Sequence, residues 1–182
     1  MLGLLAAFGL AAATGLNAYL PRLIVGLLAR HTDLIALKAP WSALTHPVVL
    51  VVIGVLLIIE FTVDKIPAVD TVNDVIQTLF RPAAGAILFA ASSNIISDVS
   101  PVLAMVCGLL IAGGVHTAKA VARPAVTAGT LGTGNPVVSL AEDAVSGVTT
   151  VVAIVAPVVL AVLLLLALWL LIRWLGRKKA GS

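Results

Sequence analysis

The stretch VVLVVIGVLLIIEFTVDKIPAVDTVND, residues 48–74, joins twelve uncharged apolar residues to a segment with four carboxylates and one lysine. The apolar part predicts a membrane-spanning helix, because roughly 20 helical residues cross a bilayer core of about 30 Å. The whole chain agrees: of its 182 residues 61% are hydrophobic and 10% charged, with a mean hydropathy of +1.19. A soluble domain has about 25% charged residues. The sequence therefore predicts an all-α integral membrane protein.

Five apolar runs predict about five transmembrane helices, at residues 2–20, 47–59, 82–97, 101–115 and 151–172. The run at 82–97 is rich in small residues, which let helices approach closely in lipid, so we expect it inside the bundle. The first run has no basic segment before it and is interpreted as a retained helix rather than a secretory signal. Residues 2–29 form either one helix of roughly 42 Å or a re-entrant hairpin. Gly15, Asn17, Pro21 and Arg22 mark the interruption.

The chain is predicted to be one membrane domain, with a broken helix or hairpin and a loop at 1–46, and a basic tail at 176–182. Basic residues follow the last apolar run and predict a cytoplasmic C-terminus by the positive-inside rule: Arg173, Arg177, Lys178 and Lys179. We interpret these basic residues as the cytoplasmic flank of the last transmembrane helix rather than as a nucleic-acid-binding patch, so we expect no nucleic-acid partner. We expect the lipid bilayer as partner.

A faint internal repeat divides the rest into units at 47–100 and 101–175. PAVDTVNDVIQTL from Pro67 matches PVVSLAEDAVSGV from Pro136. Residues upstream of these two segments also match each other, but fewer residues separate the two copies there. The change in separation between the two sets of matches indicates an insertion in the second unit near 122–134, and the Gly and Pro content of this segment predicts a loop. Each predicted unit is a span, a Pro-started amphipathic or re-entrant helix and a second span. Two spans return the chain to one side, so the repeat is predicted to be parallel.

The charged residues gather around the two Pro-started helices. Glu60 and Asp64 share one helix face, and after Pro67 a polar stripe accompanies an apolar one: Asp70, Asn73, Asp74, Gln77 and Arg81 against Val69, Val72, Ile76, Leu79 and Phe80. One interpretation is an interfacial helix with its polar stripe in water. The stripe lacks the usual basic residues, and buried carboxylates need partners or a wet cavity.

The second unit offers such partners. His116, Lys119 and Arg123 fall on one helix face. Asn135 and Pro136 suit an N-cap and a first helical position. A second polar stripe follows: Ser139, Glu142, Asp143 and Ser146. Ser139 and Glu142 also have the spacing of a capping box, which competes with Asn135 as cap.

The carboxylates allow two further chemistries. They could supply oxygen ligands to a hard cation if both polar helices converge, but no dedicated ligand spacing is present, so a metal site stays open. No common catalytic motif appears, and a non-enzyme without cofactor is favoured over an enzyme acting on lipid phosphates.

Several motifs in order resemble one family. They are ATGLNAYLP at 13–21, the E…DKIP.VD…D spacing through to Arg81-Pro82 and Gly85, H..K…R at 116–123 and NPVVSLAED at 135–143. Together they resemble the bacterial membrane-protein family called domain of unknown function 4126, over nearly the whole chain. The resemblance implies a small multi-span protein of a bacterial inner membrane and names no activity.

Membrane-embedded ionisable residues around broken helices are typical of transporters. We therefore expect a transport or channel protein for a small polar or ionic solute, working as a homodimer. Solute or ion binding is assigned to Asn17, Glu60, Asp64, Asp70, Asp74, Glu142 and Asp143. Charge balance is assigned to Lys65, Arg81, His116, Lys119 and Arg123, and helix breaks to Gly15, Pro21, Pro67, Asn135 and Pro136. Lipid handling, or a structural role without substrate, are the alternatives.

Overall fold

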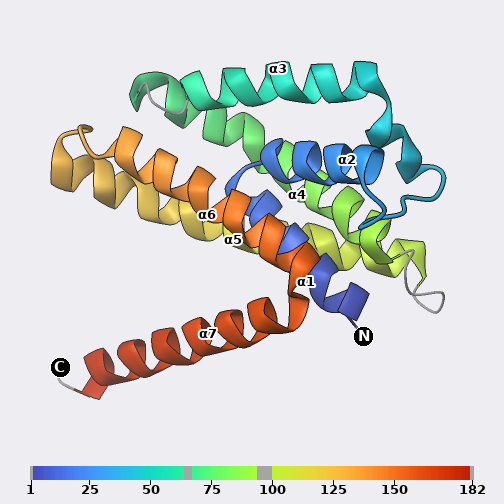
Figure 1. Ribbon diagram of the computed structural model, residues 1–182. Helices are drawn as coiled ribbons and strands as arrows, with labels where there is room; N and C mark the ends of the chain where they lie inside the picture. Colours follow the sequence, from blue (N-terminus) through green and yellow to red (C-terminus); the bar gives the residue numbers. More distant parts are fainter. Residues whose placement is uncertain (1, 64–66, 94–99, 181–182) are drawn as a thin grey trace.

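The computed structural model describes residues 2–63, 67–93 and 100–180, which form helices without any strand (Figure 1). The α-helices are α1 (Leu2–Leu16), α2 (Leu20–His31), α3 (Pro47–Val63), α4 (Pro67–Ser93), α5 (Pro101–Thr130), α6 (Asn135–Val155) and α7 (Pro157–Ala180). A short 3-10 helix, η1 (Trp41–Thr45), precedes α3. The predicted all-α class is confirmed for these residues.

The short helix α1 lies in the middle of the bundle, where it contacts α4, α5, α6 and α7. Its small side chains permit this position: Ala7, Ala11 and Ala13 are fully buried, and Phe8 packs edge-on against Phe89 of α4 with 5.1 Å between ring centroids. The chain breaks after Leu16 and turns back as α2 (Figure 1). Of the two alternatives for residues 2–29, the structure therefore has two helices rather than one.

The most extensive helix contact joins α4 and α5. It depends on two glycines, because a Cβ on Gly85 would lie 2.8 Å from the carbonyl oxygen of Gly108, and a Cβ on Gly108 would collide with the carbonyl oxygen of Gly85. Small residues at such a crossing bring helix backbones together in lipid. The described part of the predicted inner run is indeed buried, at Ala84, Ala86 and residues 88–92.

Two predictions for residues 67–134 are wrong. The polar helix after Pro67 and the apolar run at 82–97 were expected as separate elements, but α4 is continuous through Pro82. The expected loop near 122–134 is mostly helix, because the inward stripe of α5 continues at helical spacing past Arg123 to Thr127. The turn proper is short, with positive φ at Leu131 (51°) and Gly132 (84°).

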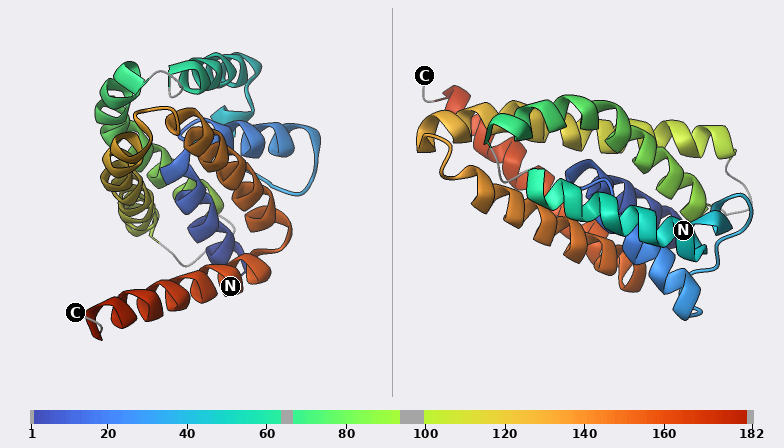
Figure 2. Two further views of the ribbon diagram at one scale, coloured as in Figure 1. Left: turned by 90° about the vertical axis from the view of Figure 1, so that its left-hand side faces the viewer. Right: turned by 90° about the horizontal axis from the view of Figure 1, so that it is seen from above.

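The predicted span at 151–172 is divided. Ala156 leaves the helical conformation (φ −140°, ψ 62°) and Pro157 opens α7. Proline suits this position, since it has no N–H to donate and its φ is already helical. α7 then lies along the outside of the bundle, in contact with α1 and α6 (Figure 2).

The predicted repeat unit also changes. Each polar helix is continuous with apolar sequence that follows it, so the two units would be α3–α4 and α5–α6 rather than two spans around a separate polar helix. The parallel repeat itself stays a prediction.

The polarity of the bundle is inverted relative to a soluble protein. In α4 the buried side chains include Gln77 and Arg81, whereas Val75, Leu79 and Phe80 are exposed. α6 repeats the pattern along its whole length, with a buried polar stripe and exposed valines and leucines. Water would penalise this exposed apolar surface, so the arrangement indicates a membrane protein.

Length and composition support the same conclusion. Within the described part of the chain, three helical segments are long and apolar enough to cross a membrane, at 75–92, 101–130 and 135–155. Shorter apolar helices lie at 3–16, 47–63 and 157–170. The expected count of five spans stays a prediction.

Candidate functional site

Among the described residues, polar and charged side chains form two clusters along the basic face of α5. The first cluster consists of Glu60 on α3, Thr78 and Arg81 on α4, and His116 on α5. The second cluster consists of Asn17 at the α1–α2 break, Lys119 and Arg123 on α5, and Glu142 and Asp143 on α6. The basic face of α5 thus supplies residues to both.

The first cluster centres on a fully buried ion pair. Nη2 of Arg81 donates to Oε1 of Glu60 at 3.0 Å, and the two side chains are 0% and 1% exposed. Nη1 of Arg81 lies 3.2 Å from Nδ1 of His116. Because a carboxylate and a guanidinium are costly to bury singly, each one stabilises the other in this interior.

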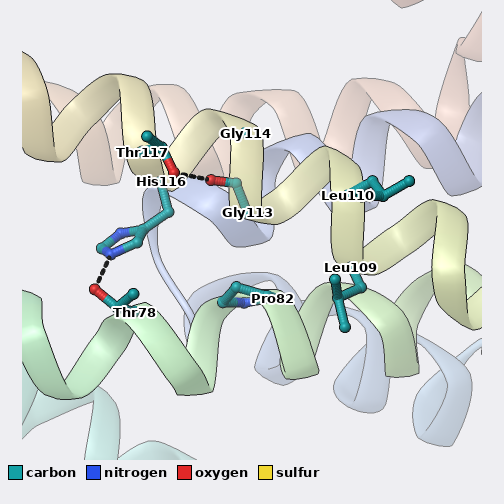
Figure 3. Close-up of a pocket in the computed structure, with 8 residues that line it drawn as sticks. All are labelled: Thr78, Pro82, Leu109, Leu110, Gly113, Gly114, His116 and Thr117. Carbon is teal, nitrogen blue, oxygen red and sulfur yellow. Dashed lines mark hydrogen bonds between the residues drawn. The ribbon is translucent and has the colours of Figure 1, made fainter.

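Hydrogen-bond chemistry fixes the tautomer of His116. Arginine has only donors, so Nδ1 of His116 must accept the bond from Arg81. A neutral imidazole carries one N–H, which therefore lies on Nε2. Nε2 is 3.0 Å from Oγ1 of Thr78 and donates to it (Figure 3). In a doubly protonated ring Nδ1 would also carry a hydrogen, which would point at the guanidinium of Arg81, and the hydrogen bond between the two side chains would be lost.

In the second cluster one carboxylate serves two cations. Oε2 of Glu142 lies 3.0 Å from Nζ of Lys119 and 2.6 Å from Nη2 of Arg123. The two cationic side chains are 2% and 6% exposed, whereas that of Glu142 is 15% exposed. Glu142 is therefore the most accessible member of these ion pairs.

The helix break joins this cluster through Asn17. Its Oδ1 accepts from the backbone N–H groups of Tyr19 (3.0 Å) and Leu20 (2.8 Å), and its Nδ2 donates to Oδ1 of Asp143 at 2.9 Å. Lys119 Nζ also donates to the carbonyl oxygen of Leu16 at 3.4 Å. Asn17 thus caps the start of α2 and ties the break to α6, while Lys119 reaches the end of α1.

The buried stripe of α6 continues away from the cluster. It consists of Asn135, Ser139, Asp143, Ser146 and Thr150. Ser146 Oγ donates to the carbonyl oxygen of Ala13 at 2.9 Å, which holds α6 against α1. Ser139 Oγ is buried and has no hydrogen-bond partner in the described part of the chain.

The two predicted caps of α6 are wrong. Asn135 is the first helical residue and Gly134 the N-cap, and Oδ1 of Asn135 accepts from Thr127 Oγ1 at 3.0 Å. Glu142 pairs with cations of α5 rather than closing a capping box with Ser139. Interhelical partners are available to both side chains in the tight α5–α6 hairpin, and they replace the local bonds that the sequence suggests.

The predicted helix breaks are mostly located as expected. Pro21, Pro67 and Pro136 lie in the first turns of α2, α4 and α6. Gly15 differs, because α1 continues through Leu16. A Cβ on Gly15 would lie 2.6 Å from the carbonyl oxygen of Ala112, so this glycine permits close contact with α5.

Part of the predicted acidic group lies outside the described structure. Asp64 and Lys65 fall in the gap at 64–66, and the side chains of Asp70 and Asp74 are not described although α4 carries both residues. The hypothesis that the two polar helices share one site stays a prediction. α5 contacts both of them: His116 contacts α4, whereas Lys119 and Arg123 contact α6.

Sequence reasoning assigned no interaction partner to several polar side chains. Arg22 donates from Nε to the carbonyl oxygen of Ala18 at 2.7 Å, and its guanidinium lies over the Tyr19 ring at 5.0 Å. The sequence signal that could have pointed to these contacts of Arg22 is a single cationic residue within an apolar run. Thr78 and Thr127 gave none, because threonine is common in apolar helices.

A metal centre finds no support among residues 2–63, 67–93 and 100–180. Among the side chains that the structure describes, which do not include those of Asp70 and Asp74, no three of His, Cys, Asp or Glu lie together as metal ligands would.

Comparison with known proteins identifies a family without an assigned activity. The family model described as "Domain of unknown function (DUF4126)" matches residues 4–177, which confirms the resemblance seen in the sequence motifs. Neither the curated proteins nor the solved structures contain a match.

Proposed function

We propose a function from the geometry alone, because the chain belongs to the family DUF4126, whose description names no activity. The proposal is membrane transport of a small polar or ionic solute. Carboxylates of the second cluster bind the solute or carry protons, and the basic residues of α5 balance their charge. The observation that carries the proposal is the α1–α2 break, where a helix end and the cap residue Asn17 meet charged side chains.

Burial supports this assignment. Ionisable residues inside a membrane bundle cost several kcal/mol and mark ion or proton pathways by default. Lys119, Arg123 and Asp143 are all less than 8% exposed, on helices whose outer faces are apolar. If these positions served only for helix packing, hydrophobic side chains would fill them with a smaller desolvation penalty.

The broken helix supports it further. Transporters commonly build midplane sites from interrupted helices, whose unpaired backbone groups contribute ligands. Here the carbonyl oxygen of Leu16 accepts from Lys119, and Asn17 bonds Asp143. A solute that replaced Lys119 or Asn17 at these contacts would be linked directly to the hinge between α1 and α2.

The proposal includes a bacterial inner-membrane location, a cytoplasmic C-terminus and a homodimer. The basic residues that follow the apolar part of α7 favour this orientation. A dimer is favoured because one short bundle encloses little volume for a solute path.

Proton flux provides the test. Purified protein is reconstituted in liposomes containing the pH dye pyranine, and a potassium diffusion potential is set with valinomycin. We expect flux above that of empty liposomes, and at least a tenfold loss in Asp143→Asn. Asp33→Asn is the matched control, because Asp33 lies exposed in the loop before η1. Equal flux in wild type, Asp143→Asn and empty liposomes would refute proton-linked transport.

Lipid handling is the second candidate, because a wholly apolar groove lies between α2 and α6. Its volume is about 420 Å³ and its lining is Ile24, Gly147, Val148, Val151 and Val152. Such a groove suits an acyl chain. Scrambling of a fluorescent phospholipid by the same liposomes, lost in Gly147→Leu, would favour this candidate over solute transport.

A further inference from the structure

A second cavity lies between α4 and α5, on the outer side of the first cluster. Its volume is about 190 Å³ and its lining is Thr78 and Pro82 from α4 and Leu109, Leu110, Gly113, Gly114, His116 and Thr117 from α5 (Figure 3). Leu109 and Leu110 are 47% and 66% exposed, so the cavity opens on the apolar outer surface. Its deep polar end is His116, which is 2% exposed.

The polar end presents a hydrogen-bond donor. Arg81 occupies Nδ1 of His116, which leaves the ring proton on Nε2, and Thr78 accepts that proton at 3.0 Å. Thr117 is committed to the carbonyl oxygen of Gly113 at 2.8 Å. A molecule that enters from the bilayer and carries a carbonyl oxygen can therefore replace or share the Thr78 oxygen as acceptor for Nε2–H.

We infer that this cavity binds an uncharged lipophilic carbonyl compound of the quinone type, with its carbonyl oxygen on Nε2–H of His116 and its ring against Pro82 and Leu109. The volume equals that of about six water molecules at about 30 Å³ each, which accommodates one ring rather than a whole lipid. The inference concerns binding only and does not depend on the proposed transport.

The position of His116 favours a membrane-dissolved molecule over a phospholipid ester. α5 has 30 residues, or about 45 Å at 1.5 Å per residue, against a hydrocarbon core of about 30 Å. His116 lies halfway along it. If α5 crosses the bilayer, the histidine is near the midplane, whereas ester carbonyls lie at the two interfaces.

Glycine provides a variant that fills the cavity without disturbing the helices. A Cβ on Gly114 meets no atom within 4 Å. Gly114 belongs to the cavity lining, so Gly114→Leu should fold and narrow the cavity. Gly54→Leu on α3 is the matched control, because a Cβ there also meets nothing within 4 Å and the residue is distant from the cavity lining.

The experiment uses the full chain in nanodiscs with ¹⁵N-labelled histidine, and decylubiquinone as the probe. His31→Gln and His46→Gln leave His116 as the only histidine. We expect a ring with its proton on Nε2, and a saturable shift of that nitrogen as the probe is added. The shift should persist in Gly54→Leu and weaken at least tenfold in Gly114→Leu.

If the leucine variant does not fold, two comparisons in the protein with His31→Gln and His46→Gln, in which Gly113 and Gly114 are retained, still test the inference. Decyltoluene has a similar tail and ring without a carbonyl, so an equal shift with it would overturn the inference. A proton found on Nδ1 would do the same. Nanodiscs of ether-linked lipids should give the same resonance as ester-linked lipids before the probe is added. A change between them would assign the cavity to the phospholipid carbonyl instead.

Discussion

The two clusters differ in how completely the protein encloses their charges. Glu60 and Arg81 form an ion pair whose side chains are 0–1% exposed, whereas the carboxylate of Glu142 contacts two cations and is 15% exposed. Fully buried charges are the least open to exchange with a solute, so we expect the Glu60–Arg81 pair mainly to fix helix positions. The second cluster has an accessible carboxylate and a helix break beside it, so exchange is expected there.

Arg81→Met should have the largest effect on stability. It leaves the Glu60 carboxylate buried without its guanidinium, which costs about 3–5 kcal/mol for a buried pair. The free energy of unfolding in mixed micelles containing dodecyl sulfate measures the loss. The double variant Glu60→Gln/Arg81→Met should be more stable than Arg81→Met alone. A loss below about 1 kcal/mol would mean that the first cluster is no more enclosed than a surface pair.

Gly108→Ala should follow, because the new Cβ meets backbone and side-chain atoms of α4, including the Cβ of Phe89 at 2.6 Å. Overpacking of this kind costs about 1–3 kcal/mol, and it should weaken the first cluster more than the second by moving α4 from α5. Gly54→Ala is the control and should be neutral. Equal unfolding free energies for the two alanine variants would contradict the close α4–α5 crossing.

Asn17→Ala should cost about 2 kcal/mol, since a helix cap contributes about 0.5–2 kcal/mol and the bond to buried Asp143 is also lost. We expect flux to fall with it, because the link between the break and the second cluster is removed. Asn17→Asp retains an oxygen that can cap α2 but places a second negative charge beside Asp143. This variant therefore separates the capping role of Asn17 from its bond to Asp143. Normal stability in Asn17→Ala would refute the capping role.

Glu142→Gln should have the smallest effect on stability, about 1 kcal/mol, because the side chain is partly exposed and the amide still offers an acceptor. Its effect on flux should nevertheless exceed that of Asp33→Asn. If Glu142→Gln destabilised the protein as much as Arg81→Met, the distinction between the clusters would fail.

The sequence predicted the components of both clusters better than their pairing. The stripe spacing identified Gln77 and Arg81 on one helix and Ser139, Asp143 and Ser146 on another, because helical periodicity is a local property. Asn17 was identified by the interruption around it. Glu142 was expected near Ser139 and instead pairs across helices, since a local motif cannot reveal which neighbouring helix supplies a stronger partner.

Helix boundaries were the least predictable feature. Proline predicted breaks at Pro21, Pro67 and Pro136 correctly or nearly so. The break at Pro157 was not predicted, and α4 and α5 continue through Pro82 and Pro124. In a bundle, interhelical contacts on both sides of a proline hold the helix together despite the lost hydrogen bond. That information lies in tertiary contacts and is absent from the local sequence.

The Gly85–Gly108 crossing also limits how the molecule can move. Each of these glycines lies against the carbonyl oxygen of the other, so we expect α4 and α5 to move together as one rigid body. Any rearrangement that opens the second cluster must then displace α6 and the α1–α2 hinge against this body. Spin-label distances should therefore stay constant between α4 and α5 and change between α5 and α6.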